Sequence, residues 1–269
     1  MAIEQRELFG LGHLANTDVD GKYIDHNLVV LGGGLSLSLP FTVNLWVNKR
    51  SAFAGIHTFI SLFSDSGGGD ISCYEIGTNN ITPFRFRMRV QDASGAATAT
   101  PNTSVALAIN TWYMVTAVFT ASNNRTLYVN AANPVTNTVN RIVETPTKYV
   151  VGGISSGNAI FLNTGKNPPY GVSLYAGAYT AEVGIWTAAL NADEITSLYK
   201  GARTVQVRPQ SLRSYLPLIR EYKQELTGRN SSVGIDPDYD ANDFFVFDGN
   251  EIVATEPIPV VDHGIRRYG

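Results

Sequence analysis

Trp112-Tyr-Met-Val-Thr-Ala-Val-Phe119 is a continuous run of β-branched and aromatic residues. The turn-forming residues Ser122-Asn-Asn124 follow this run and separate it from Arg125-Thr-Leu-Tyr-Val-Asn130. Runs of this composition, bounded by Ser and Asn, are typical of antiparallel strands. The stretch therefore predicts β structure, and it is the part of the chain that decides the fold.

The residues on the N-terminal side extend the same pattern. Phe41-Thr-Val-Asn-Leu-Trp-Val47 and Phe84-Arg-Phe-Arg-Met-Arg-Val90 follow a period of two, which indicates half-buried antiparallel strands. Gly-, Ser- and Asn-containing turn signals at 66–70, 92–95 and 155–158 separate the strands at short intervals. Many short strands with almost no helical periodicity predict an all-β sandwich or jelly roll.

One short helix is predicted after these strands. Asn191-Ala-Asp-Glu194 has the spacing of a capping box, and Ile195, Leu198 and Tyr199 fall on one helical face. Gly201 provides a left-handed stop. We expect this helix to close an end of the sandwich rather than to form a layer.

Several motifs resemble laminin G-like, concanavalin A-like jelly rolls. Residues 110–130 resemble that family's W-x-x-V … L-Y-V-N-G hairpin. Five further stretches resemble the closing segment of that family: Val151-Gly-Gly-Ile154, Ala176-Gly-Ala-Tyr179, Glu182-Val-Gly-Ile-Trp186, Ala189-Leu-Asn-Ala-Asp-Glu-Ile195 and Leu198-Tyr-Lys-Gly201. The resemblance covers about residues 28–201. It implies an all-β, concanavalin A-like (laminin G-like) antiparallel β-sandwich or jelly roll with one short helix and an extended C-terminal arm.

The tail carries a second resemblance. Residues 208–218, with Glu225-Leu226-x-Gly228 after them, are similar to C-terminal segments of such jelly rolls encoded in bacteriophage genomes. They also look like the opening strand of a laminin G-like domain, which implies a permuted order with a strand at 211–218 completing the sandwich. We therefore divide the chain into a jelly-roll domain, 1–218, and an extended acidic arm, 219–269.

Charge is unevenly distributed along the chain. The formal net charge is −3, yet residues 230–262 contain eight acids and no Lys or Arg. This acidic segment is either a solvated loop or a partner contact, and the candidate contact residues are Asp236, Asp238, Asp240 and Asp243. The near-balanced total disfavours a nucleic-acid partner, and no stretch approaches the roughly 20 apolar residues of a membrane helix.

The residues needed for catalysis are absent from the pattern. Enzymes of the resembled superfamily carry a strand like Glu-x-Asp-x-Glu, because retaining hydrolysis needs two carboxyl groups about 5 Å apart. Asp70 and Glu75 would point to opposite faces of one strand, and Glu182 stands alone in its strand. The single Cys73 is expected to be a small buried residue, and the histidines are scattered singly: His13, His26, His57 and His263. We expect no catalytic residues and no enzyme activity.

No metal or cofactor site is predicted. Asp236-Pro-Asp-Tyr-Asp-Ala-Asn242 has the alternating oxygen ligands of a calcium loop. An EF-hand needs Gly at its sixth position and Glu at its twelfth, where this chain has Ala241 and Phe247. The EF-hand is excluded, and a loosely bound calcium ion stays an open alternative.

The sharpest surface feature is the alternation of Arg85, Arg87 and Arg89. With the apolar residues between them turned inward, the three guanidinium groups share one face over about 13 Å. This arginine ladder could contact sulfated or acidic glycans or the carboxylates of a neighbouring protein. Alternatively it is a solvated face whose charge cross-strand acids offset.

These observations favour a non-catalytic protein that works through surface contacts. The leading hypothesis, from the tail resemblance, is a bacteriophage virion protein, made in the host cytoplasm, that decorates or cements the capsid. Its partners would be the major capsid protein or another virion protein, and we expect a homo-oligomer.

Two alternatives stay open. The first is a lectin-like carbohydrate-binding module of a tail or cell-surface protein. Its candidate aromatic residues are Tyr74, Tyr170, Tyr175 and Tyr179, and half-buried packing explains each of them at least as well. The second, weaker alternative is a glycoside hydrolase with an atypical site.

Overall fold

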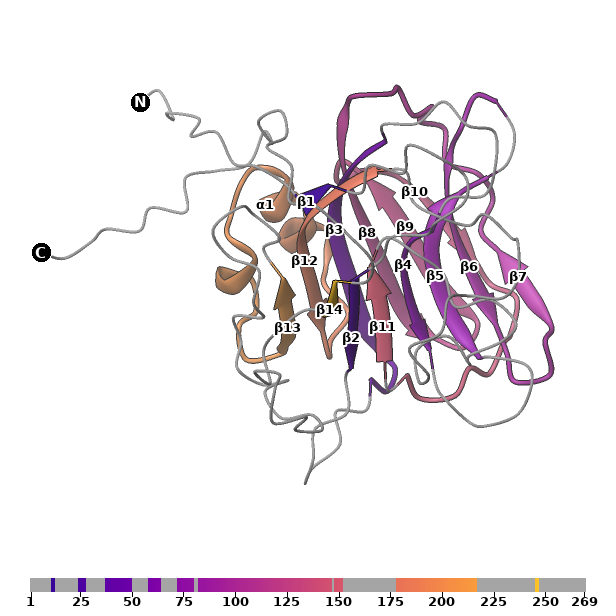
Figure 1. Ribbon diagram of the computed structural model, residues 1–269. Coiled ribbons are helices and arrows are strands. Elements are labelled where there is room, and N and C mark those ends of the chain that lie inside the picture. Colours follow the sequence, from indigo (N-terminus) through magenta and orange to yellow (C-terminus); the bar gives the residue numbers. More distant parts are fainter. Residues whose placement is uncertain are drawn as a thin grey trace, which may run out of the picture.

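The computed structural model describes residues 11–12, 24–27, 37–49, 58–63, 72–79, 82–146, 148–151, 178–216 and 245–246. Within them the chain forms two antiparallel sheets of seven strands each, which pack face to face (Figure 1). The predicted all-β sandwich is thereby confirmed. No helix in this described part of the chain has the length and apolarity needed to cross a membrane.

The first sheet contains the hairpin that decides the fold. Its strand order is β1-β12-β3-β8-β9-β10, and β13 also pairs with β12. Since β3 occupies one edge of β12, β1 and β13 share the other: β1 lies along 179–180 and β13 along 183–186. The bounds are β1 Leu11–Gly12, β3 Phe41–Lys49, β8 Trp112–Ala121, β9 Asn124–Val129, β10 Ala132–Asn137, β12 Ala178–Trp186 and β13 Leu212–Leu216.

The second sheet has the order β14-β2-β11-β4-β5-β6-β7. Its bounds are β2 Ile24–Asn27, β4 Thr58–Phe63, β5 Cys73–Thr78, β6 Phe86–Gln91, β7 Ala97–Ala99, β11 Lys148–Val151 and β14 Phe245–Val246. β14 comes from the segment 219–269, which the sequence predicted as an extended arm. Its two residues pair with Asp25 and Ile24 at the edge of the sheet, so this part of the arm adds a strand to the sandwich.

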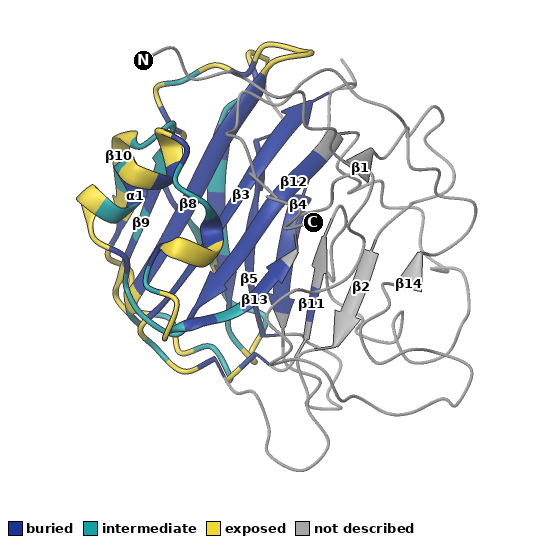
Figure 2. Cartoon of the chain, turned by 90° about the vertical axis from the view of Figure 1, so that its left-hand side faces the viewer, coloured by how far each residue is buried: buried dark blue, intermediate teal, exposed yellow. Residues whose placement is uncertain are grey.

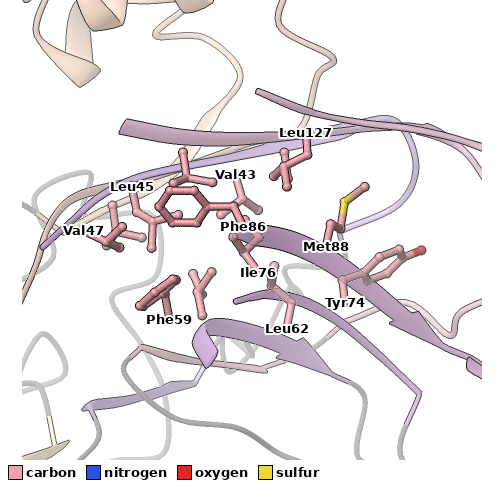
Figure 3. Packing of buried hydrophobic residues seen from close by; sticks show 14 of the residues in the cluster. Val43, Leu45, Val47, Phe59, Leu62, Tyr74, Ile76, Phe86, Met88 and Leu127 are labelled. Atoms are coloured by element: carbon pink, nitrogen blue, oxygen red, sulfur yellow. The ribbon is translucent and has the colours of Figure 1, made fainter. Parts of the chain in front are cut away.

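The two sheets enclose one apolar core (Figure 3). Phe41 and Phe119 stack with ring centroids 4.5 Å apart, and Tyr74 meets both rings edge-on at 5.0 and 4.7 Å. Alternate residues of each strand reach this core because successive side chains point to opposite faces. Those labelled in Figure 3 are Val43, Leu45, Val47, Phe59, Leu62, Tyr74, Ile76, Phe86, Met88 and Leu127.

A second apolar cluster covers the outer face of the first sheet. Ile195 and Leu198 of helix α1 (Ala192–Tyr199) pack with outward-facing side chains of the strands, among them Trp46, Met114 and Trp186. Figure 2 shows the helix lying over this sheet. The helix therefore forms a partial third layer, and the expectation that it closes an end of the sandwich was wrong. For the same reason β3 is not half-buried as predicted: all nine of its residues are buried.

The ends of α1 follow the sequence prediction. The Asn191 side chain accepts a hydrogen bond from the Glu194 amide at 2.9 Å, and the Glu194 carboxylate accepts one from the Asn191 amide at 2.8 Å. This reciprocal pair is the predicted capping box. Gly201, with φ of 99°, ends the helical segment in the left-handed conformation that glycine adopts without steric cost.

Two basic side chains are buried at opposite ends of the core. Arg125 donates to the Asn137 side chain and to the Val139 carbonyl, each at 3.0 Å, and so holds the segment after β10 against the sandwich. Lys49 lies at the other end, with its Nζ 4.3 Å from the centroid of the Phe84 ring. Burial lowers the pKa of Lys49 to about 8.

Replacing Lys49 with Met should stabilise the fold at neutral pH. The folded-state pKa of Lys49 lies below its ordinary 10.5, so the stability that this group contributes is lost as the pH falls from 10.5 through about 8. At pH 7 we expect Lys49→Met to raise the free energy of unfolding by about 1–2 kcal/mol, since some solvent screening remains. Urea unfolding at pH 7 and pH 10.5 measures this, and an equal gain at both pH values would contradict the explanation.

Gly184→Ala should destabilise the fold because β12 has no room for a methyl group there. The added Cβ would lie 2.5 Å from Cη2 of Trp186 and 2.7 Å from Cγ2 of Thr204. We expect a loss of about 2 kcal/mol in the free energy of unfolding. In a Trp186→Phe background, which lacks the clashing ring, the cost of the alanine should shrink. A cost that does not change in that background refutes the steric account.

Candidate functional site

The two sheets present different outer faces. The outer face of the first sheet lies under the second apolar cluster, whereas β6 alternates between buried and partly exposed residues. On β5 and β6 the residues opposite to the core-facing ones are mostly polar. We call this surface the polar face and define it by Ser61, Cys73, Glu75, Gly77, Arg85, Arg87, Arg89 and Gln91.

Strand register arranges the polar face in rows. Ser61 of β4, Glu75 of β5 and Arg89 of β6 are direct cross-strand neighbours, and Ala99 of β7 continues the row. In a neighbouring row Gly77 lies opposite Arg87. Directly opposite residues have Cβ atoms about 4.5–5.5 Å apart, so the side chains within a row can contact each other.

Glu75 and Arg89 form an ion pair at the centre of the polar face. Nη1 of Arg89 lies 3.0 Å from Oε1 of Glu75, and the two side chains are 24% and 4% exposed, respectively. Arg89 also donates to the Gln91 side chain. Burial raises the pKa of Glu75, whereas the Arg89 guanidinium lowers it. Arg89 is therefore held by two neighbours within the molecule.

The Cys73 thiol is part of the same cluster. Its Sγ donates to Oε1 of Glu75 at 3.4 Å, and the residue is fully buried. Burial and the Glu75 carboxylate both raise the pKa of the thiol. Cys73 is thus buried, as the sequence predicted, and it stays protonated and unreactive.

Arg85 is fixed by the backbone. Its Nη1 donates to the Thr103 carbonyl at 3.0 Å and to the Ser104 carbonyl, and its amide donates to Oδ1 of Asn79 at 2.9 Å. An isolated bridge pairs Arg85 with Ala106. The guanidinium therefore holds the crossing segment that follows β7.

Arg87 differs from both neighbouring arginines. It makes no hydrogen bond or ion pair within the described part of the chain, although the charges of Glu75 and Arg89 act on it. Burial lowers its pKa, Glu75 raises it and Arg89 lowers it further. A guanidinium is so basic that Arg87 stays charged at neutral pH. The arginine ladder thus has its predicted common face, but its outer two members are already bound.

A family model described as the concanavalin A-like lectin/glucanases superfamily matches residues 23–196. This range covers more than half of the 269 residues. The chain belongs to the concanavalin A-like lectin/glucanases superfamily. The family resemblance of the hairpin and of the closing motifs is confirmed, and the bacteriophage origin stays a prediction.

Solved structures similar to this concanavalin A-like chain are larger proteins. The match to the botulinum neurotoxin serotype D binding domain covers 64% of this chain and 38% of the toxin domain, with 13% identity and a TM-score of 0.43. The serotype G binding domain matches 61% and 37%, with 17% identity and a TM-score of 0.42.

A Trypanosoma rangeli sialidase matches 60% of this chain and 22% of its own, with 16% identity and a TM-score of 0.40. At such identities the similarities concern the fold alone. The chain spans little more than a third of the two toxin domains. A comparison with curated protein sequences gives no match.

The tyrosines predicted for carbohydrate contact do not gather on the polar face. Tyr74 is 2% exposed and packs in the core, because on β5 it alternates with Cys73 and Glu75 and shares the inward face with Ile76. Burial raises its pKa to about 12. Tyr74 is therefore a packing residue, the alternative that the sequence left open for it, and its prediction as a surface contact was wrong.

The other predicted contact residues lie outside what the structure describes. Tyr179 has a described backbone in β12, paired with Asn48, but its side chain is outside the described residues. The remaining candidates outside the described residues are Tyr170, Tyr175, Asp236, Asp238, Asp240 and Asp243, and the predicted calcium loop lies there too. Among the residues that are described, no group of three His, Cys, Asp or Glu is placed to hold a metal ion.

Glu182 forms a second polar cluster that sequence reasoning missed. Each of its carboxylate oxygens accepts from the Tyr215 hydroxyl at 2.9 Å, and Oε2 also accepts from the Thr204 hydroxyl at 3.1 Å. Glu182 is 2% exposed and has φ of 53°, at a register shift between β12 and β3. Burial and then Glu182 raise the pKa of Tyr215. The carboxylate therefore ties β13 and the 3-10 turn η2 (Thr204–Gln206) to β12.

The Glu75–Arg89 pair should contribute measurably to stability. Glu75→Gln leaves a partly buried guanidinium without its carboxylate, and we expect a loss of about 1–3 kcal/mol in the free energy of unfolding. Replacing both residues, Glu75→Leu with Arg89→Met, should recover most of this loss. Equilibrium unfolding of Glu75→Leu, of Arg89→Met and of the double variant gives the coupling energy.

The pair Glu194–Arg208 is a matched control for this cycle. Its atoms also approach closely, at 2.8 Å, but its side chains are 23% and 28% exposed. Its coupling should stay below about 1 kcal/mol. A coupling for Glu75 and Arg89 no larger than the control would contradict a role for burial.

Proposed function

We propose that this concanavalin A-like chain is a non-catalytic carbohydrate-binding domain whose ligand lies on the polar face. The observation that carries the proposal is the contrast between the two outer faces. The centre of the first sheet is covered by α1 and the second apolar cluster, whereas Arg87 and Arg89 on β6 are partly exposed. Family membership supports carbohydrate as the ligand class, since the superfamily description names lectins and glucanases.

Binding without hydrolysis fits the carboxylates on this surface. Glycoside hydrolysis needs two carboxyl groups, about 5 Å apart for retention and further apart for inversion. The sequences of β4, β5, β6 and β7 contain one carboxylate, Glu75. That carboxylate is 4% exposed and is bound by Arg89 and Cys73. It is therefore placed to hold an arginine, not to attack or protonate a sugar.

Capsid decoration, the leading hypothesis from the sequence, stays a prediction, as do the virion location and the homo-oligomer. Its contacts were assigned partly to the acidic segment that contains Asp236 and Asp243, which lies outside the described residues. The arginine ladder, its other assigned contact, is described, and two of its three arginines are bound within the molecule. The described surface therefore favours the carbohydrate-binding alternative.

A panel of immobilised neutral and acidic oligosaccharides tests the proposal, with the full chain as analyte in calcium and in chelator. Ala99→Tyr places a ring beside Arg89 and should weaken binding at least about tenfold by occluding the polar face. Ala132→Tyr, exposed on β10 of the other sheet, is the matched control and should bind as wild type. Retention of no glycan, equal effects of the two variants, or release of reducing ends would each refute the proposal.

A further inference from the structure

We infer that Arg87 is the ligand contact of the polar face and that the ligand is an acidic glycan, whose carboxylate or sulfate accepts hydrogen bonds from the guanidinium. The inference rests on the carbohydrate-binding function proposed above and deepens it. Arg85 donates to two backbone carbonyls and Arg89 to Glu75 and Gln91. Arg87 makes no comparable bond within the described residues, so its donors are available to a ligand.

The charge around Arg87 favours an anion. Three guanidinium groups share the polar face with one carboxylate, and that carboxylate already contacts Arg89. Residues two apart on a strand are about 6.6–6.8 Å apart, so Arg85 and Arg89 add to the positive potential at Arg87. A guanidinium is weakly hydrated and matches carboxylate and sulfate oxygens in a bidentate geometry. An anion at this position also offsets the cost of the partial burial of Arg87.

The residues that flank this part of β6 on the polar face have small side chains. Gly77, which has no side chain, lies directly opposite Arg87 on β5. On the other side of β6, the positions of β7 that share this face are Ala97 and Ala99. The side chains across from this part of β6 are therefore small, and among the members of the polar face it is the arginines Arg85, Arg87 and Arg89 that are partly exposed, since Gly77 itself is buried.

The same surroundings favour a glycan over an acidic protein. Protein interfaces centre on aromatic or aliphatic anchors that are buried on binding. The neighbours of Arg87 on the polar face are glycine, alanine, arginine, Glu75 and Gln91. In the described part of the chain, the large exposed apolar side chains belong to other segments: Ile109, Val139, Ile142, Tyr199 and Val205.

Calorimetric titration of the full chain tests the inference. The probes are a galacturonate hexasaccharide, a heparin hexasaccharide, a neutral N-acetylglucosamine hexasaccharide and a hexaglutamate peptide. Arg87→Gln should weaken binding of the acidic glycan about 10- to 100-fold. Arg87→Lys should recover only part of this loss, because it restores the charge without the bidentate geometry.

Lys200→Gln is the charge-matched control. Lys200 is exposed at the C-terminal cap of α1, over the first sheet, so its loss should change affinity less than about twofold. Thermal unfolding of each variant checks that the fold is retained. The carboxylated and sulfated probes show which anion the site prefers.

The possible outcomes distinguish a failure of the Arg87 site from a failure of the carbohydrate-binding function. Tight binding of the neutral hexasaccharide that Arg87→Gln leaves unchanged overturns the inference and leaves the carbohydrate-binding function standing. Tighter binding of hexaglutamate than of any glycan overturns both. Equal losses from Arg87→Gln and Lys200→Gln overturn the inference, because they indicate unspecific attraction.

Discussion

The central strands of the first sheet are buried on both sides, and the rest of the architecture follows from this constraint. Every residue of β3 is buried, with Val43 and Leu45 in the core and Trp46 under the layer that contains α1. Water is thereby excluded from both faces of this sheet near its centre. In the opposite sheet β5 is likewise buried throughout, whereas Arg87 and Arg89 of β6 are partly exposed between buried neighbours.

Hydrogen bonding within the polar face then decides which charges remain for a ligand. A buried carboxylate requires a partner, and Glu75 obtains Arg89 and Cys73. The crossing segment after β7 requires donors for its carbonyls, and Arg85 supplies them. Two of the three arginines, Arg85 and Arg89, are therefore bound within the molecule. Arg87 is the third, and within the described residues its guanidinium makes no such bond, while Arg85 and Arg89 on either side are held in place.

Much of the fold follows from residue patterns alone. The hairpin around 112–129, the capping box at Asn191 and the inward direction of Phe86 and Met88 all depend on local spacing, which the sequence displays directly. The placement of α1 did not follow, although Trp46 and Trp186 lie at outward positions that need a cover. Tyr74 was misplaced because an aromatic residue was read without its period-two neighbours Glu75 and Ile76.

The sequence by itself determined which face each strand residue occupies, because side-chain direction along a strand depends only on position parity. It thus determined the class of the fold and the common face of Arg85, Arg87 and Arg89. Only the tertiary structure decided which arginine is available, since the partners of the other two come from segments that are brought close by strand register. Register depends on the turn that joins two strands and on packing across the sheet, and the sequence of β6 alone does not encode it.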